Sequence, residues 1–144
     1  MQPGIHVSRV WSDNDLIELR VDVSDGRSCF SNEVYVGHGA LEDAVSSLRG
    51  FKDQIHGGLL DVRFGEFGPE YAKGAFHARF HFSAGGRLLV SCEQESGFAP
   101  FGKKDVASRA TLYVKSEPAL LDRFISELQA VATGRNEEAH LEAI

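Results

Sequence analysis

The hydrophobic residues near the C-terminal end of the chain recur with the period of a helix. Five of them share one face of a 3.6-residue helix, namely Leu121, Phe124, Ile125, Leu128 and Val131. Ser116 suits an N-cap, Pro118 suits the first turn because it has no N–H to leave unpaired, and Gly134 suits the C′ position. The pattern predicts a helix over Pro118–Ala132, preceded by a strand that begins at about Ala110.

A shorter strand-to-helix pattern lies earlier in the chain, over Glu33–Phe51. Leu41, Val45, Leu48 and Phe51 keep the helical spacing, and we expect a helix over about Ala40–Ile55 that Gly57 and Gly58 end. Upstream, Arg20–Arg27 aligns with Arg79–Arg87 across one inserted residue, and each is typical of strand, glycine turn, strand, with Asp25-Gly26 as the first turn. This likeness suggests two duplicated β-hairpin-plus-helix halves, about residues 5–56 and 59–134; the alternative is chance recurrence of short β–turn–β patterns.

Alternating apolar and polar residues predict the strands. The cleanest alternation is Ala75–Phe82, which sets four apolar residues against His77, Arg79, His81 and Ser83. Further strands are expected at Ile5–Trp11 as an edge strand, Leu16–Val23, Ser28–Val36, Leu60–Phe64 and Arg87–Gln94. The fold class is therefore α+β: one domain with an antiparallel sheet of about six to seven strands and both helices on one face. The acidic tail, residues 135–144, either extends the last helix or frays.

Composition and charge narrow the function. The 144 residues are 42% hydrophobic and 25% charged, which is ordinary for a globular protein, and no apolar run approaches the ~20 residues of a membrane span. The first residues lack the basic and apolar regions of a signal peptide, so the cytoplasm is expected. A net charge of −6 argues against nonspecific nucleic-acid binding and suits a basic partner surface. Cys29 and Cys92 are expected to be buried, reduced thiols.

The polar face of the Ala75–Phe82 strand is the main candidate for chemistry. His77, Arg79 and His81 could contact a phosphate, and the plainer interpretation is a solvated polar face. A metal site there is rejected, because the two histidines are ~13 Å apart along a strand, whereas the ligands of one ion lie within about 2.1 Å of it. We find no catalytic motif and expect no cofactor, and Glu93 and Glu95 cannot be told from ordinary surface acids as an acid/base pair.

The segment Glu95–Val106 has no periodicity and is long for a loop in a compact domain, which is typical of functional or disordered segments. Phe98 and Phe101 within it are candidate interface anchors, and with Glu93 and Glu95 they form the predicted partner-binding set. The alternative, which we favour at this point, is that both rings fold back and cap the core, because two exposed phenylalanines would promote aggregation.

The chain resembles bacterial immunity proteins of the WapI type. The resemblance rests on the glycine-turn hairpins, the Tyr35-Val and Tyr113-Val strand ends, and a terminal helix with a Leu-x-x-Phe-x-x-x-Leu core, here Leu121, Phe124 and Leu128. It implies a small cytoplasmic protein that binds and neutralises a cognate toxin domain without catalysis or a cofactor. It transfers no functional residues, because toxin-contacting positions differ from pair to pair. The alternative function is a small-molecule or phosphate-binding domain, with or without enzymatic activity, that uses His77, Arg79 and His81.

Overall fold

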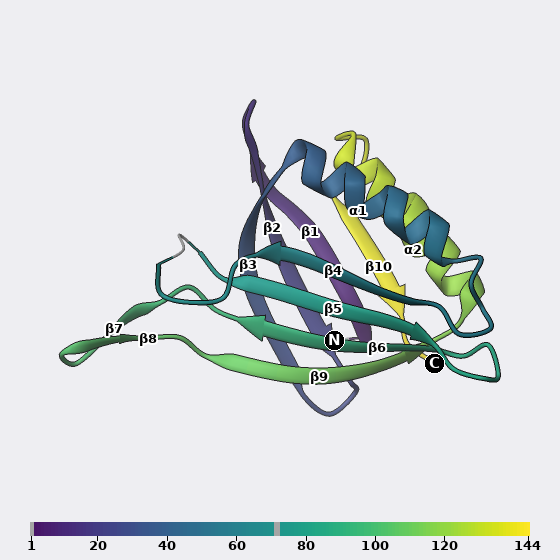
Figure 1. The fold of residues 1–144 in the computed structure, drawn as a ribbon. Coiled ribbons are helices and arrows are strands. Elements are labelled where there is room, and N and C mark those ends of the chain that lie inside the picture. The colour runs from purple at the N-terminus through teal and green to yellow at the C-terminus, as the bar shows by residue number, and fades with distance from the viewer. Residues whose placement is uncertain (1, 71–72) are drawn as a thin grey trace.

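The computed structural model describes residues 2–70 and 73–144 (Figure 1). Along the chain the elements are β1 (Gly4–Ser12), β2 (Leu16–Ser24), β3 (Cys29–Gly37), α1 (His38–Phe51), β4 (Leu59–Gly65), β5 (Ala75–Phe82), β6 (Leu88–Glu95), β7 (Ala99–Phe101), β8 (Lys104–Val106), β9 (Arg109–Ser116), α2 (Pro118–Ala132) and β10 (Glu138–Glu142). The predicted α+β class is confirmed.

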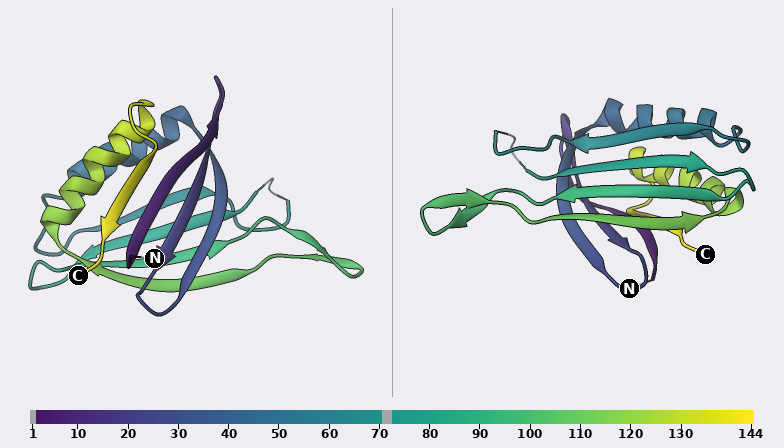
Figure 2. Two further views of the ribbon diagram at one scale, coloured as in Figure 1. Left: turned by 180° about the vertical axis from the view of Figure 1, so that it is seen from behind. Right: turned by 60° about the horizontal axis from the view of Figure 1, so that its bottom comes forward.

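The strands of the described residues form three antiparallel sheets. Sheet A has the order β10-β1-β2-β3, sheet B has the order β4-β5-β6-β9, and β7 pairs only with β8. Figure 2 shows sheet A crossing sheet B, with the β7–β8 hairpin extending beyond both. The predicted single sheet of six to seven strands is therefore wrong. Alternation predicts β1 to β6 and β9 correctly. The same alternation, however, is typical of two sheets that face each other as well as of one sheet that faces helices.

The buried faces of the two sheets and of both helices meet in one hydrophobic cluster. α2 lies along β10 at the edge of sheet A, and α1 lies against α2 and beside β4 at an edge of sheet B. The helix pair therefore spans the open side between the sheets (Figure 1). This corrects the predicted placement of both helices on one face of a single sheet, and it leaves the outer face of each sheet without a helix.

Helix α2 has the predicted bounds, Pro118–Ala132, but a different N-cap. Glu117 occupies the N-cap position and makes no side-chain capping bond. Ser116 is fully buried, and its hydroxyl donates a 2.6 Å hydrogen bond to the backbone carbonyl of Glu142. The predicted capping serine therefore fastens the start of α2 to β10.

The C-terminal end of α2 explains why the chain reverses there. Gly134 has φ +78°, a left-handed conformation that favours glycine. The N–H of Gly134 donates to Val131 and the N–H of Arg135 to Ala130, which together form a Schellman motif. The motif ends the helix at the predicted glycine and sends the chain back along sheet A.

The returning tail forms strand β10, which neither predicted alternative anticipated. β10 pairs antiparallel with β1, with Leu141 opposite Ile5 and Ala139 opposite Val7. β1 is therefore an interior strand, and its prediction as an edge strand is wrong. Only three apolar residues, Ala139, Leu141 and Ala143, carry the alternation in the tail, too few to distinguish a strand from a frayed end.

Helix α1 is shorter than predicted, because it ends at Phe51 and Ile55 lies in the following turn. β3 runs directly into α1 and β9 leads into α2, so the strand-to-helix unit is present twice. The origin of the two units by duplication stays a hypothesis. In the β2–β3 hairpin, the N–H of Asp25 donates to Ser28, which places the turn one residue later than predicted.

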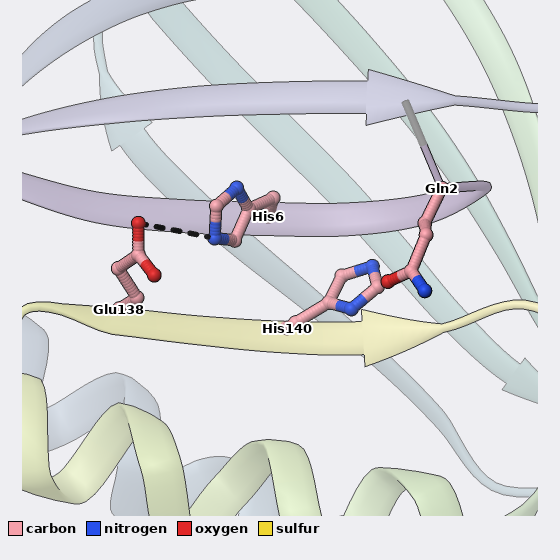
Figure 3. Close-up of a pocket in the computed structure, with 4 residues that line it drawn as sticks. All are labelled: Gln2, His6, Glu138 and His140. Carbon is pink, nitrogen blue, oxygen red and sulfur yellow. Dashed lines mark ion pairs between the residues drawn. The ribbon is translucent and has the colours of Figure 1, made fainter.

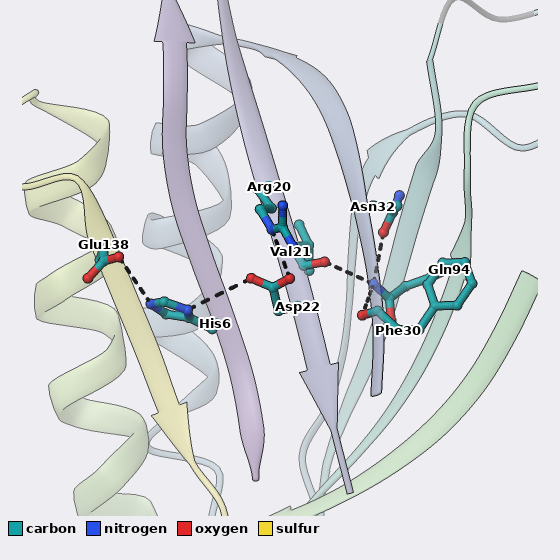
Figure 4. Close-up of polar contacts among 8 residues, drawn as sticks. All are labelled: His6, Arg20, Val21, Asp22, Phe30, Asn32, Gln94 and Glu138. Atoms are coloured by element: carbon teal, nitrogen blue, oxygen red, sulfur yellow. Dashed lines mark hydrogen bonds and ion pairs between the residues drawn. The ribbon is translucent and has the colours of Figure 1, made fainter. Parts of the chain in front are cut away.

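A buried polar seam joins the two sheets where they cross (Figure 4). The side-chain amide of Gln94, on β6, donates to Asn32 Oδ1 at 2.8 Å and to two backbone carbonyls of sheet A at 3.2 Å. The side-chain amide of Asn32, on β3, donates to carbonyls of β5 and β6 at 3.2 and 3.1 Å. The side-chain amides of Gln94 and Asn32 thus join the two sheets by hydrogen bonds to backbone carbonyls and to each other.

The two cysteines have different environments. Cys92 is buried in sheet B as predicted, and its burial raises the pKa of the thiol to about 12. Cys29 is exposed at the start of β3, which contradicts the prediction of a buried thiol. It occupies a position of β3 that faces away from the core, because residues of a strand alternate between faces.

Candidate functional site

The segment predicted to be a long loop contains a regular hairpin, β7–β8, which we call the arm (residues 98–106). Its strands pair with Phe101 opposite Lys104 and Ala99 opposite Val106. Gly102 begins the two-residue turn with φ +67°, as a type II′ turn requires. At the base, the N–H of Ser96 donates to the carbonyl of Ser108 at 2.9 Å. The arm is therefore a regular hairpin with a defined turn, and it projects beyond the two large sheets (Figure 1).

The two candidate aromatic anchors differ in exposure. Phe101, near the tip of the arm, is 70% exposed. Phe98, at the base, is partly buried but does not belong to the hydrophobic cluster. The interpretation that both rings cap the core is therefore wrong. Lys104 shares the face of Phe101, and the exposed Lys103 lies in the turn, so the tip combines an aromatic ring with two positive charges.

The candidate face with His77, Arg79 and His81 lies on the outer side of sheet B, as predicted. Asp61 of β4 is between the first two: its carboxylate accepts hydrogen bonds from His77 Nε2 at 2.8 Å and from Arg79 Nε at 2.9 Å. These bonds, from Arg79 first and then His77, lower the pKa of Asp61 from 3.8 to about 2. A phosphate there would meet donors that are already engaged and a carboxylate that repels it. His81 lies further along the strand, opposite Leu89.

The two candidate acids are also in different environments. Glu93 is exposed on the outer face of sheet B, opposite His77. Glu95 is 3% exposed and pairs with Arg109 Nε at 3.0 Å, while its other oxygen accepts a 2.8 Å hydrogen bond from the backbone N–H of Gly68. The predicted pair is thus divided: Glu93 is open to a partner, and Glu95 is a structural residue at the base of the arm.

One depression on the surface was not predicted. It holds about 370 Å³ on the outer face of sheet A and is lined by Gln2, His6, Glu138 and His140 (Figure 3). His6 Nε2 is 3.7 Å from Glu138, and its Nδ1 is 3.9 Å from the buried carboxylate of Asp22. Burial, followed by the neighbouring His6, lowers the pKa of His140. Sequence reasoning missed this depression because it exists only where β10 pairs with β1.

The four residues that line the depression are all polar or titratable, and the depression is partly open to solvent. In residues 2–70 and 73–144, no three or more histidine, cysteine or acidic side chains are placed to hold a metal ion.

A second unpredicted feature is an aromatic patch at the end of sheet A where β1 meets β2. We call it the rim patch: Val10, Trp11, Leu16 and Tyr35. The Trp11 and Tyr35 rings meet edge to face, 6.5 Å between centroids, and Lys73 Nζ is 5.2 Å from the Tyr35 ring. Val10 and Trp11 are each 48% exposed. A bulge between Arg9 and Trp11 turns Trp11 to the outer face, which sequence alternation alone does not reveal.

Acidic side chains surround the rim patch. Asp15 in the β1–β2 turn and Glu33 on β3 are exposed, whereas Glu18 forms an ion pair with Lys73. Lys73 lowers the pKa of Glu18, and Glu18 in turn raises the pKa of Lys73. The exposed Trp11 ring and the exposed acids Asp15 and Glu33 therefore lie at the same end of sheet A, with Lys73 beside them.

Comparison with protein-family models, with curated proteins and with solved structures finds no match. The resemblance to immunity proteins accordingly rests on the residue pattern of the chain itself. Neither α1 nor α2 is long and apolar enough to cross a membrane, within the part of the chain that the structure describes.

Proposed function

We propose that this chain is a non-catalytic protein-binding module of the cytoplasm, and that its partner is a cognate toxin domain that it neutralises. The observation that carries the proposal is the 70% exposure of Phe101 on the projecting arm. Large aromatic side chains dominate binding energies at interfaces, and Phe101 is the most exposed of the large hydrophobic residues that the structure describes.

The construction of the arm supports this role. A two-stranded hairpin alone is only marginally stable in water. The projecting arm therefore contributes little to the stability of the fold. Its face carries the apolar side chains of Ala99, Phe101 and Val106 beside Lys104, and none of them is part of the core cluster. A partner that covers this face would bury the aromatic ring and stabilise the hairpin at once.

The charge of the molecule supports a basic partner for the body of the module. The net charge is −6, and the exposed acids Glu33 and Glu138 lie on the outer face of sheet A. Acidic surfaces of this kind speed encounter with basic proteins, as nuclease-like toxin domains commonly are. The arm then supplies the anchor, and the acids supply the long-range attraction.

The alternative, a phosphate or small-molecule site at His77, Arg79 and His81, has less support. His77 and Arg79 already donate hydrogen bonds to Asp61, whose carboxylate places a negative charge where a phosphate would bind. The outer face of sheet B remains available for protein contacts through His81, Leu89 and Glu93.

The experiment begins with capture of the partner from the native host and measurement of its affinity for the purified chain. We expect Phe101→Ala to weaken binding about tenfold or more through a faster off-rate, and added salt to lower mainly the on-rate. Tyr113→Ala is the matched control, because Tyr113 is 67% exposed but lies on sheet B, away from the arm. Undiminished affinity and growth protection in Phe101→Ala would refute the arm as the anchor.

A further inference from the structure

Two exposed patches of the chain have complementary chemistry. The arm tip presents Phe101 together with Lys103 and Lys104. The rim patch presents Trp11 and its apolar neighbours, bordered by exposed acids. Each patch exposes an aromatic ring to solvent on the single chain, and the lysines of the arm tip are opposite in charge to Asp15 and Glu33 beside the rim patch.

The charge of the arm tip is positive, unlike the net charge of this protein. The whole chain carries −6, yet the turn of the arm carries two adjacent lysines, balanced only by Asp105 on the opposite face of the hairpin. Two copies of an acidic body repel each other in most orientations. The orientation that brings the arm of one copy to the acidic rim of the other replaces repulsion with attraction.

We propose that two copies of this chain associate by exchanging arms, so that Phe101 of each copy packs on Trp11 and Leu16 of the other. In the same contact, Lys103 and Lys104 face Asp15 and Glu33 across the interface. The inference goes beyond the proposed function and does not depend on it, since it concerns the chain alone.

A two-fold axis makes this contact reciprocal. Closed symmetric pairs are the commonest assemblies of identical chains, and each such pair makes every contact twice. Aromatic packing supplies most of the attraction, and a lysine over the Trp11 ring adds a cation–π contribution. Because one arm covers a small area, the pair is weak and forms in a concentration-dependent equilibrium.

The exchange also has a consequence for partner binding. The pair covers Phe101, which a single copy leaves exposed, so the arm is protected until a tighter-binding partner displaces the second copy. Self-association and partner binding through the arm then exclude each other.

Sedimentation equilibrium of the purified full chain, without any partner, tests the inference. We expect the average mass to rise from the monomer value of 15.8 kDa toward twice that value over about a hundredfold range of concentration. Phe101→Ala should weaken association about tenfold or more, and Tyr113→Ala should leave it unchanged. A monomer mass at every concentration, or equal association by Phe101→Ala, overturns the inference.

A charge-swap experiment tests the pairing itself. A chain with Lys103→Glu and Lys104→Glu, and a second chain with Asp15→Lys and Glu33→Lys, should each be monomeric alone because like charges then meet at both contacts. Mixed together they should form a heterodimer, because both reciprocal contacts regain opposite charges. All four residues are exposed, so circular dichroism should show an unchanged fold.

Failure of the mixture to associate while both chains remain folded overturns the arm-to-rim contact. That result would leave the proposed function untouched, because toxin binding is measured separately with the captured partner. Conversely, loss of toxin binding by Phe101→Ala with no self-association at any concentration would keep the proposed function and refute the exchange.

Discussion

At the residue scale, the neighbours across strands decide what each polar side chain does. The sequence places His77, Arg79 and His81 on one face correctly, because alternation in a strand fixes the face. It does not reveal that Asp61 lies opposite Arg79, since this depends on the register between β4 and β5. A cluster that suggests a phosphate site in one strand is therefore an ion-pair network in the sheet.

The Asp61 network makes stability depend on pH. The pKa of Asp61 is about 2 in the folded protein, below its usual 3.8, so the folded state favours the ionised carboxylate. Its contribution is fully present above about pH 4 and is lost as the pH falls toward about 2. We expect Asp61→Asn to lower the free energy of unfolding by about 1 kcal/mol at pH 7, after allowance for solvent screening of a carboxylate that is 23% exposed.

Urea unfolding at a series of pH values checks this expectation. The difference between Asp61→Asn and the unaltered protein should shrink as the pH is lowered from about 4 to about 2, because both then lack the charge. Glu93→Gln controls for the lost negative charge, since Glu93 is exposed on the same face. A difference that stays constant over this range would mean that the variant acts through packing and not through the ionised carboxylate.

At the element scale, the long periodic segments could be predicted and the short ones could not. α2 and β5 have their predicted bounds, because one period runs through the whole of each element. β7 and β8 have three residues each and include Pro100, so they have no detectable period, and their pairing depends on the turn at Gly102. The candidate anchors Phe98 and Phe101 were identified from composition, but their exposure depends on that hairpin.

The face assignment of α2 gives a stability prediction. Phe124 and Leu128 are 3% and 1% exposed, and both line the interior between the two sheets. Replacing either by alanine should lower the free energy of unfolding by about 2–5 kcal/mol, because a cavity remains in a packed core. The shift of the denaturant midpoint measures this loss.

Ser126→Ala is the matched control for these core replacements. Ser126 is exposed on the same helix, so its replacement should change stability by no more than about 0.5 kcal/mol. Similar midpoints for all three variants would show that the buried face of α2 is misassigned.

At the scale of the whole molecule, the division into two sheets lay beyond sequence reasoning. A strand with one buried face has the same alternation whether a helix or a second sheet covers it. The residues that fix the crossing of the sheets, Asn32 and Gln94, occupy inward positions where polar side chains are costly to bury. Their polarity at these inward positions was the signal in the sequence that could have revealed them. Their partners were not predictable, because the two residues whose side chains bond to each other are 62 positions apart in the sequence.

The seam should behave as one energetic unit. Asn32→Ala and Gln94→Ala each leave buried polar groups of the other sheet without a partner, at a cost of about 1–3 kcal/mol. The bond between the two side chains is lost in either variant, so the double variant should cost less than the sum of the single ones. We expect a coupling energy of about 0.5–3 kcal/mol, measured as urea unfolding of all four proteins in a double-mutant cycle.

Gln94→Ala combined with Ser126→Ala provides the control cycle, because Ser126 is exposed on α2 and shares no partner with the seam. Those two changes should add within about 0.3–0.5 kcal/mol. Equal additivity in both cycles would mean that the two amides stabilise their own sheets independently. The crossing of sheet A over sheet B would then depend on the hydrophobic cluster alone, and the position of the arm relative to the rim patch would not be held by the seam.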